Sequence, residues 1–211
     1  MTRKGEDAAL LALMRAIAAG KADASRLLKA SPALAAACLT KGATRQSAKP
    51  YFLGDIAHYV YAGHTALHVA AAAHRDDIAQ QLLALGADVR AKNRRGAEPL
   101  LYAAVGSPGS PTWDPHAQAK IIVRLIAAGA DPNVEDFSGT RPLHRAVRTR
   151  CATAVRALLE GGADPRLKTR RGSTAMRLAV VTSGRPDSGS VEAKVQQEEI
   201  MRVLRQHGGG R

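Results

Sequence analysis

The stretch Gly-His-Thr-Ala-Leu-His-Val-Ala at positions 63–70 opens a unit that closes with Leu-Leu-Ala-Leu-Gly-Ala-Asp at 82–88. The pattern returns as Gly-Thr-Arg-Pro-Leu-His-Arg-Ala at 139–146 and Leu-Leu-Glu-Gly-Gly-Ala-Asp at 158–164. Both copies have the same 33-residue length. Such a fixed period predicts a chain that is built from stacked copies of one supersecondary unit.

Three further copies are less regular. One is ten residues longer than the unit, with the excess around 106–115, and the last holds about thirteen extra residues around 183–191. The first copy is divergent and is followed by an overlong arm. We predict a single domain over 1–211 of about five repeats, with the outer two acting as caps. The predicted repeats are 6–62, 63–95, 96–138, 139–171 and 172–211.

Each unit has the pattern of a helix, a turn and a second helix. Thr65 and Thr174 are placed to cap a first helix through the side-chain oxygen. Pro99 and Pro142 fall at the first helical position, where a missing N–H costs nothing. Apolar residues three or four apart mark the second helix, and a glycine suited to a left-handed conformation ends it. These glycines are Gly86, Gly129 and Gly162.

The period, the two Leu-His openings and the Gly-Ala-Asp closings resemble ankyrin repeats over about residues 63–208. The resemblance implies an all-α ankyrin-repeat solenoid with short β-hairpin arms and divergent N- and C-terminal caps. It also implies a module without catalytic activity that binds another protein through its concave surface. The short motifs, long arm and insertions resemble a bacterial ankyrin repeat protein.

The charge of the chain is uneven along this repeat. There are 31 Lys and Arg against 18 Asp and Glu, a formal net charge of +13, of which residues 139–177 carry +8. Two predicted arms are basic, 92–95 and 168–171, and the arm at 135–138 reads Glu-Asp-Phe-Ser. Alignment with the family places arm and first-helix residues on the binding surface. The candidate partner-binding residues are Tyr61, His64, Lys92, Arg94, Arg95, Glu135, Phe137, Arg148, Lys168, Arg170 and Arg171.

Several arginines on one surface suit bidentate contacts to carboxylate or phosphate. We therefore predict a protein partner with an acidic stretch and an apolar group near Phe137. The alternative is nucleic acid or an anionic membrane surface bound through the same arms, although these arms carry few aromatics and no known reader motif. A third interpretation is a solvated basic surface that keeps the protein soluble.

Aromatic residues concentrate in the overlong arm. Four of the seven in the chain lie within 51–61, where they either form an interface or fill a gap behind the first regular repeat. Trp113 lies in the 106–115 insertion. Long loops of this kind often serve function, so the two insertions are either a lip beside the binding surface or neutral expansions.

No arrangement of side chains predicts catalysis, a cofactor or a metal site. His64 and His68 lie four apart on an expected helix, which suggests metal ligands, but His68 aligns with His144 and we interpret it as a structural residue of the repeat. Cys151 follows two arginines that would lower a thiol pKa, or it is simply a small residue at a turn. We expect no enzyme.

No stretch approaches the roughly 18–20 apolar residues that span a bilayer. Two cysteines do not make a disulfide framework, which favours a reducing, cytoplasmic compartment. We expect the protein to be monomeric.

Overall fold

The computed structural model describes most of the chain. It divides into two compact units, Met1–Tyr102 and Ala103–Arg211, each with buried apolar residues of its own. The predicted loop 183–191 lies outside the described residues except for Val191, and the 106–115 loop is described only in part. The described residues are 3–20, 22–106, 108, 110, 113–181 and 191–209.

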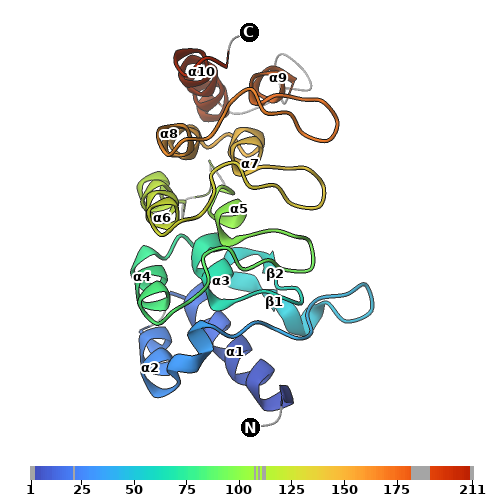
Figure 1. Ribbon diagram of the computed structural model, residues 1–211, viewed down its shortest axis with the longest axis vertical. Helices are drawn as coiled ribbons and strands as arrows, with labels where there is room; N and C mark the ends of the chain where they lie inside the picture. Colours follow the sequence, from blue (N-terminus) through green and yellow to red (C-terminus); the bar gives the residue numbers. More distant parts are fainter. Residues whose placement is uncertain are drawn as a thin grey trace. The chain divides into compact units, whose positions relative to one another are not determined.

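Helices of the first unit form two layers (Figure 1). The first helices of two repeats, α1 (Arg3–Ala18) and α3 (Ala66–Ala72), pack side by side, and each also packs on the second helix of its own repeat. These second helices are α2 (Asp23–Ala30) and α4 (Asp76–Ala84), which contact each other. The short α5 (Pro99–Ala103) ends at the boundary of the unit. The core between the layers includes Leu10, Leu13, Ile17, Leu28, Leu67, Ile78 and Leu82.

The overlong arm of the first unit contains the two strands of the described chain. β1 (Phe52–Leu53) pairs antiparallel with β2 (His58–Tyr59), so Phe52 lies opposite Tyr59 with ring centroids 4.7 Å apart. Both rings remain about 40% exposed, whereas Leu53 is buried. The arm therefore fills space with its aliphatic residues and leaves the aromatic pair on the surface. Three 3₁₀ turns complete the segment: η1 (Pro32–Ala35), η2 (Lys49–Tyr51) and η3 (Gly54–Ile56).

The second unit repeats the two-layer arrangement (Figure 1). Its second helices α6 (Pro115–Ala127), α8 (Ala152–Glu160) and α10 (Val191–Gln206) stack in one layer. The first helices α7 (Pro142–Arg148) and α9 (Ala175–Val181) stack in the other. The buried residues between them include Ile122, Leu125, Leu143, Val147, Val155, Leu158, Ile200, Val203 and Leu204.

Local signals in the sequence placed most helix ends correctly. The Thr65 hydroxyl accepts a hydrogen bond from the backbone N–H of His68 at 3.4 Å, and Pro99 and Pro142 are the first residues of α5 and α7. The three glycines that follow the second helices have φ of 87°, 100° and 95°, as the left-handed conformation requires. The all-α fold and these caps are confirmed.

Two expectations need correction. Outside β1 and β2, the arms of the described chain contain turns instead of hairpin strands, because each arm closes within four or five residues. His64 does not share a helix with His68, since α3 begins at Ala66 and His64 precedes the Thr65 cap.

Candidate partner-binding surface

One turn geometry recurs in the three arms, which we define as the first arm (92–95), the second arm (135–138) and the third arm (168–171). In each arm the backbone N–H of the second residue donates to the carbonyl four residues later, at 2.9–3.1 Å. Its own carbonyl accepts from the backbone N–H of a glycine three residues later, at 2.8 Å in every case. The second residue therefore closes the turn and the third and fourth residues form its tip. The closing residues are Asn93, Asp136 and Thr169.

The side chain of the closing residue completes the turn. Asn93 is 4% exposed, and its Oδ1 accepts hydrogen bonds from the backbone N–H groups of Arg95 at 2.8 Å and Ala97 at 3.2 Å. Its Nδ2 donates to the Tyr102 hydroxyl at 2.7 Å, which anchors the arm to α5. The arm tip is therefore held from beneath by a buried side chain, which leaves the next two residues exposed.

The first arm presents two arginines held against an aromatic ring. The guanidinium carbons of Arg94 and Arg95 lie 4.7 and 5.0 Å from the centroid of the Tyr61 ring, within cation–π range. The Arg94 backbone N–H also donates to the Ala62 carbonyl at 2.9 Å. Lys92 lies beside the buried Glu98, with Nζ 3.8 Å from Oε1. The arm thus presents oriented positive charge and not two free side chains.

His64 lies beneath this surface and not on it. Its side chain is fully buried, with ring centroids of Tyr102 at 5.1 Å and His68 at 4.9 Å. Nδ1 accepts a hydrogen bond from the Tyr61 backbone N–H at 3.0 Å. Burial, together with the nearby His68 and His58, lowers the pKa of His64 well below its usual value. Its assignment to the binding surface is corrected because the overlong arm and α5 cover it.

His68 and His144 hold equivalent places in the two units. The Nε2 of His68 lies 3.0 Å from the Ala97 carbonyl, and the Nε2 of His144 lies 3.1 Å from the Leu167 carbonyl. Each ring thus ties the start of a first helix to a backbone carbonyl next to an arm, just after the first arm for His68 and just before the third for His144. Burial lowers the pKa of His68 to about 4 and also lowers that of His144. The interpretation of these histidines as structural residues of the repeat is confirmed.

Both acidic residues of the second arm are paired with arginines. Glu135 pairs with Arg141 at 2.8 Å, and Asp136, which is 7% exposed, pairs with Arg145 at 2.8 Å. Burial alone would raise the pKa of Asp136, but hydrogen bonds from Ser138, Thr140 and Arg145 hold it below its usual value. The predicted alternation of positive and negative arms therefore needs correction. The second arm does not present free negative charge, because arginines of the same unit neutralise its two carboxylates.

Phe137 is the exposed apolar residue of the second arm. It forms the tip of the turn, and its ring is 67% exposed, far above most apolar residues of the chain. The two acidic residues before it are already paired. This arm therefore presents an apolar contact surface beside the basic residues of α7 and the third arm.

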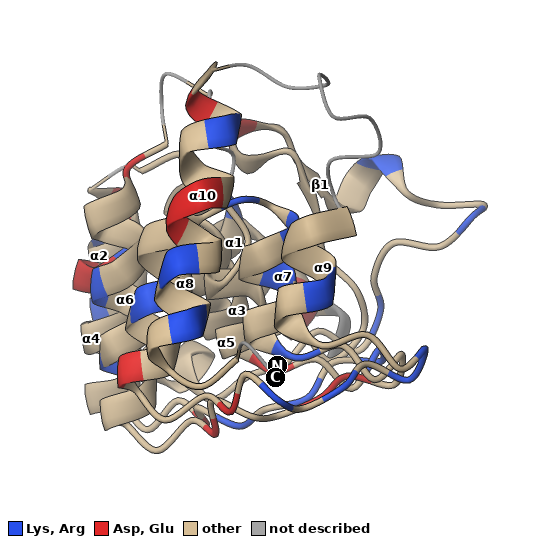
Figure 2. Cartoon of the chain, turned by 90° about the horizontal axis from the view of Figure 1, so that it is seen from above, with Lys and Arg blue, Asp and Glu red and all other residues tan. Residues whose placement is uncertain are grey.

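The third arm packs directly against the second. The Arg141 guanidinium donates to the Lys168 carbonyl at 3.2 Å. A Cβ atom on Gly139, where φ is 72°, would lie 2.8 Å from the Arg170 Cβ. The backbones therefore approach as closely as a glycine permits. Lys168, Arg170 and Arg171 are exposed, and Figure 2 shows further Lys and Arg residues on α7 and α9.

We predict that Gly139→Ala lowers the free energy of unfolding of the second unit by about 2–3 kcal/mol. Both the left-handed φ and the clash with Arg170 oppose a methyl group there. Gly172 is the matched control, because its φ is 78° but a Cβ atom at that position would have no other atom within 4 Å. Gly172→Ala should cost about 1 kcal/mol. Urea unfolding of both variants measures the difference, and equal losses would show that the arms do not pack closely.

The lowered thiol pKa considered for Cys151 needs correction. The thiol is buried at the start of α8, and burial raises its pKa despite a hydrogen bond with Thr149. The arginines that precede it in the sequence are not among the groups that shift this pKa. Cys151 is a small residue packed at the turn, as the simpler interpretation stated.

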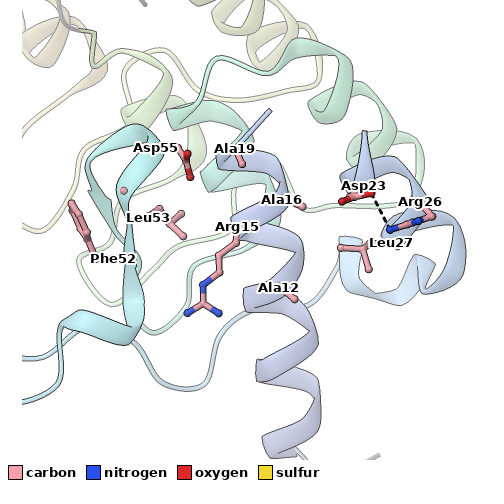
Figure 3. A pocket seen from close by; sticks show the side chains of 11 residues that line it. Ala12, Arg15, Ala16, Ala19, Asp23, Arg26, Leu27, Phe52, Leu53 and Asp55 are labelled. Carbon is pink, nitrogen blue, oxygen red and sulfur yellow. Dashed lines mark ion pairs between the residues drawn. The ribbon is translucent and has the colours of Figure 1, made fainter. Parts of the chain in front are cut away.

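A cavity of about 440 Å³ in the first unit lies along α1, between α2 and the β1–η3 segment (Figure 3). Its floor is formed by Ala12, Ala16 and Ala19. Figure 3 shows Arg15 directed away from the Asp23–Arg26 ion pair, which has a 2.9 Å separation. The Arg15 guanidinium donates to the Pro50 carbonyl at 2.8 Å. The two arginines that line this cavity are thus already engaged within the unit.

Across the described ranges, no helix is both long and apolar enough to cross a membrane. In the same part of the chain, no group of three or more His, Cys, Asp or Glu side chains is arranged to hold a metal ion. The arms of each unit, with their exposed basic and aromatic side chains, are the candidate binding sites.

The predicted site residues differ in their exposure and in whether they contact one another. It brings Tyr61, Arg94 and Arg95 together in the first unit. Sequence reasoning missed the closing residues Asn93 and Asp136, whose signal was the glycine three positions after each. Nine of the eleven predicted residues are exposed, Tyr61 is half-buried and His64 is buried; the exposed ones are Lys92, Arg94, Arg95, Glu135, Phe137, Arg148, Lys168, Arg170 and Arg171.

Comparison with known proteins gives two family matches. Residues 62–94 match the family described as ankyrin repeat, and residues 125–179 match ankyrin repeats in many copies. The first match lies in the first unit, and the second lies in the second unit and includes the repeat at 139–171.

Several curated proteins are similar to this chain. CAP-Gly domain-containing linker protein 3 of Homo sapiens is 37% identical over 45% of this chain and 16% of its own length. Ankyrin repeat and SOCS box protein 16 of Mus musculus is 34% identical over 55% of the chain and 25% of its length. Ankyrin repeat and SOCS box protein 6 of Homo sapiens is 28% identical over 69% and 35%.

The chain thus covers about a third or less of the length of these relatives. All three relatives are mammalian, and the resemblance to bacterial proteins stays a prediction. Ankyrin repeats are protein–protein interaction modules, and this describes the repeat and not the whole of any relative. The turn geometry shared by the arms of both units, together with the two family matches, shows that this chain is an ankyrin repeat protein.

Proposed function

We propose that the protein binds a partner protein with acidic features through the arm tips of each unit, without catalysing a reaction. The observation that carries the proposal is the design of the arms. A buried closing residue holds the tip of the first and second arms, and the half-buried Thr169 holds that of the third. The tips present Arg94, Arg95, Phe137, Arg170 and Arg171. Oriented arginines beside an exposed aromatic ring are typical of interface hot spots.

The contacts and exposure of the aromatic rings at the predicted site favour a protein partner over nucleic acid. The Tyr61 ring already contacts two guanidinium groups, which compete with any base that would stack on it. Phe137 is the exposed ring among the predicted site residues. A single apolar anchor among arginines suits a folded or extended acidic peptide segment.

A monomeric state belongs to the same proposal, and so does a cytoplasmic location, which the two free cysteines support.

The test reverses the charge of one arm at a time. We expect Arg170→Glu with Arg171→Glu to weaken partner binding at least about tenfold, and Arg94→Glu with Arg95→Glu to do the same for contacts of the first unit. Lys29→Glu with Arg205→Glu is the matched control, since it changes the net charge equally at exposed helix positions away from the arms. Partners captured by the wild-type chain are quantified with each variant by calorimetry.

Equal binding by the arm variants and the control would overturn the proposal. A second measurement addresses nucleic acid. If the wild-type chain binds random duplex DNA with an affinity that falls steeply with salt, and the partner capture does not depend on the arms, the electrostatic alternative holds instead.

A further inference from the structure

A polar pocket of about 410 Å³ lies within the second unit, between the second arm and α7. Ser138 and Thr140 line it from the arm, Arg145, Arg148 and Thr149 from α7 and its end, and Val105 adds an apolar wall. No acidic residue is among these lining side chains. The pocket is therefore a positively charged hollow beside the exposed Phe137.

Three arginines follow one face of α7 at spacings of four and three, which places their side chains in a row. Arg141 pairs with Glu135 and Arg145 pairs with Asp136, both at 2.8 Å. The third, Arg148, is exposed, and the described part of the chain gives it no ion pair or hydrogen bond. The second arm supplies two carboxylates for three arginines.

The other polar groups of the pocket are already engaged. The Ser138 hydroxyl donates to the Asp136 carboxylate at 2.5 Å and lies 3.0 Å from the Thr140 hydroxyl. The Thr149 hydroxyl donates to the Arg145 carbonyl at 3.1 Å. The Arg148 guanidinium, which carries five N–H donors in a planar fork, is thus the uncommitted donor group of the pocket as described.

We propose that this pocket binds one carboxylate side chain, Asp or Glu, of the partner protein, with Arg148 as the residue that pairs with it. The partner's carboxylate would form an ion pair with Arg148, as Glu135 and Asp136 of the second arm do with Arg141 and Arg145. A bidentate Arg–carboxylate pair is among the stronger polar contacts in proteins. The proposal rests on the protein-binding function above and names the chemistry of one contact in it.

Charge balance favours a carboxylate over a phosphate. Arg145 and Arg148 bring two positive charges to the pocket, and Asp136 removes one, so the net charge is +1. A carboxylate neutralises this charge. A phosphate monoester carries about −1.5 to −2 at neutral pH and would leave excess negative charge next to Asp136.

The experiment titrates the complete chain with three pentapeptides, each with glycines around a central Glu, Gln or phosphoserine, and follows the backbone amides of Ser138, Thr140 and Thr149 by NMR. We expect the Glu peptide to shift these amides with millimolar affinity and the Gln peptide to leave them unchanged. Arg148→Gln should weaken Glu-peptide binding about tenfold or more. Arg177→Gln, at an exposed arginine on α9, should change it by less than about twofold.

Arg148→Lys retains the charge but not the planar fork and should give an intermediate affinity. Equal binding by wild type and Arg148→Gln, or shifts spread evenly over all the basic residues, would overturn the pocket. Tighter binding of the phosphoserine peptide than of the Glu peptide would overturn the choice of carboxylate. Neither result bears on the proposed function itself, which the arm-reversal variants decide separately.

Discussion

Replacing Asp136 with alanine is expected to destabilise the second unit by about 3 kcal/mol. The carboxylate is 7% exposed and accepts hydrogen bonds from the Ser138 and Thr140 backbone N–H groups at 2.9 and 3.0 Å. Without it these donors lose their partner, and the largely buried Arg145 loses its counter-charge. An unpaired group of either kind is costly inside a protein.

Asp136→Asn is the control, because the first arm has Asn93 at the equivalent place. An amide oxygen accepts the two backbone hydrogen bonds as Asn93 does, so only the pairing with Arg145 is lost and the expected cost is about 1–2 kcal/mol. Trp113, the only tryptophan, lies in the second unit and reports its unfolding in urea by fluorescence. Equal losses in both variants would show that the closing hydrogen bonds contribute little.

Acid is expected to destabilise the first unit between about pH 6.5 and pH 4. Burial lowers the pKa of His68 to about 4, whereas the unfolded chain has the ordinary value near 6.5. Between these values the unfolded state binds a proton that the folded state does not, so stability is complete above pH 6.5 and falls as the pH falls. The loss from His68 reaches about 3 kcal/mol near pH 4. His64 acts in the same direction, because its pKa is also lowered.

The measurement is urea unfolding by circular dichroism from pH 7 to pH 4, with hydrogen exchange of α3 to localise the effect. His68→Gln keeps a donor for the Ala97 carbonyl but no titrating group. This variant should be less stable at pH 7. Its free energy of unfolding should also depend less on pH in this range, with a slope smaller than that of the wild type by about 1.4 kcal/mol per pH unit. A variant with the wild-type slope would show that His68 is not the group that titrates.

Features fixed by neighbouring residues were predictable from the sequence. The 33-residue period, the Thr65 cap and the glycines after the second helices depend on backbone preferences within one turn. The tips of the arms were predictable for the same reason, since a glycine shortly after Asn93 and Asp136 marks a tight turn. These local signals and the repeat period were sufficient to identify the fold, while the candidate residues came from alignment with the ankyrin family.

Burial and pairing across the unit were not predictable in this way. His64 has the spacing of a surface residue, but residues 36–62 and Tyr102 close over it, and only the packed unit shows this. Likewise, the sequence shows Glu135 as a free negative charge. Its pairing with Arg141 depends on how the second arm folds back toward the start of α7. Charge counted along a chain does not reveal which charges are already paired.

The division of each arm into a closing residue and an exposed tip has a consequence for evolution and for engineering. Folding constrains the closing residue and also Ser138, whose hydroxyl donates to the Asp136 carboxylate. The other tip side chains are exposed and are constrained mainly by what they touch outside the chain. Specificity can therefore drift without loss of stability. A combinatorial library that varies positions 94, 95, 137, 170 and 171 would sample new recognition on a preserved scaffold, provided that Asn93, Asp136, Ser138, Thr169 and the following glycines stay unchanged.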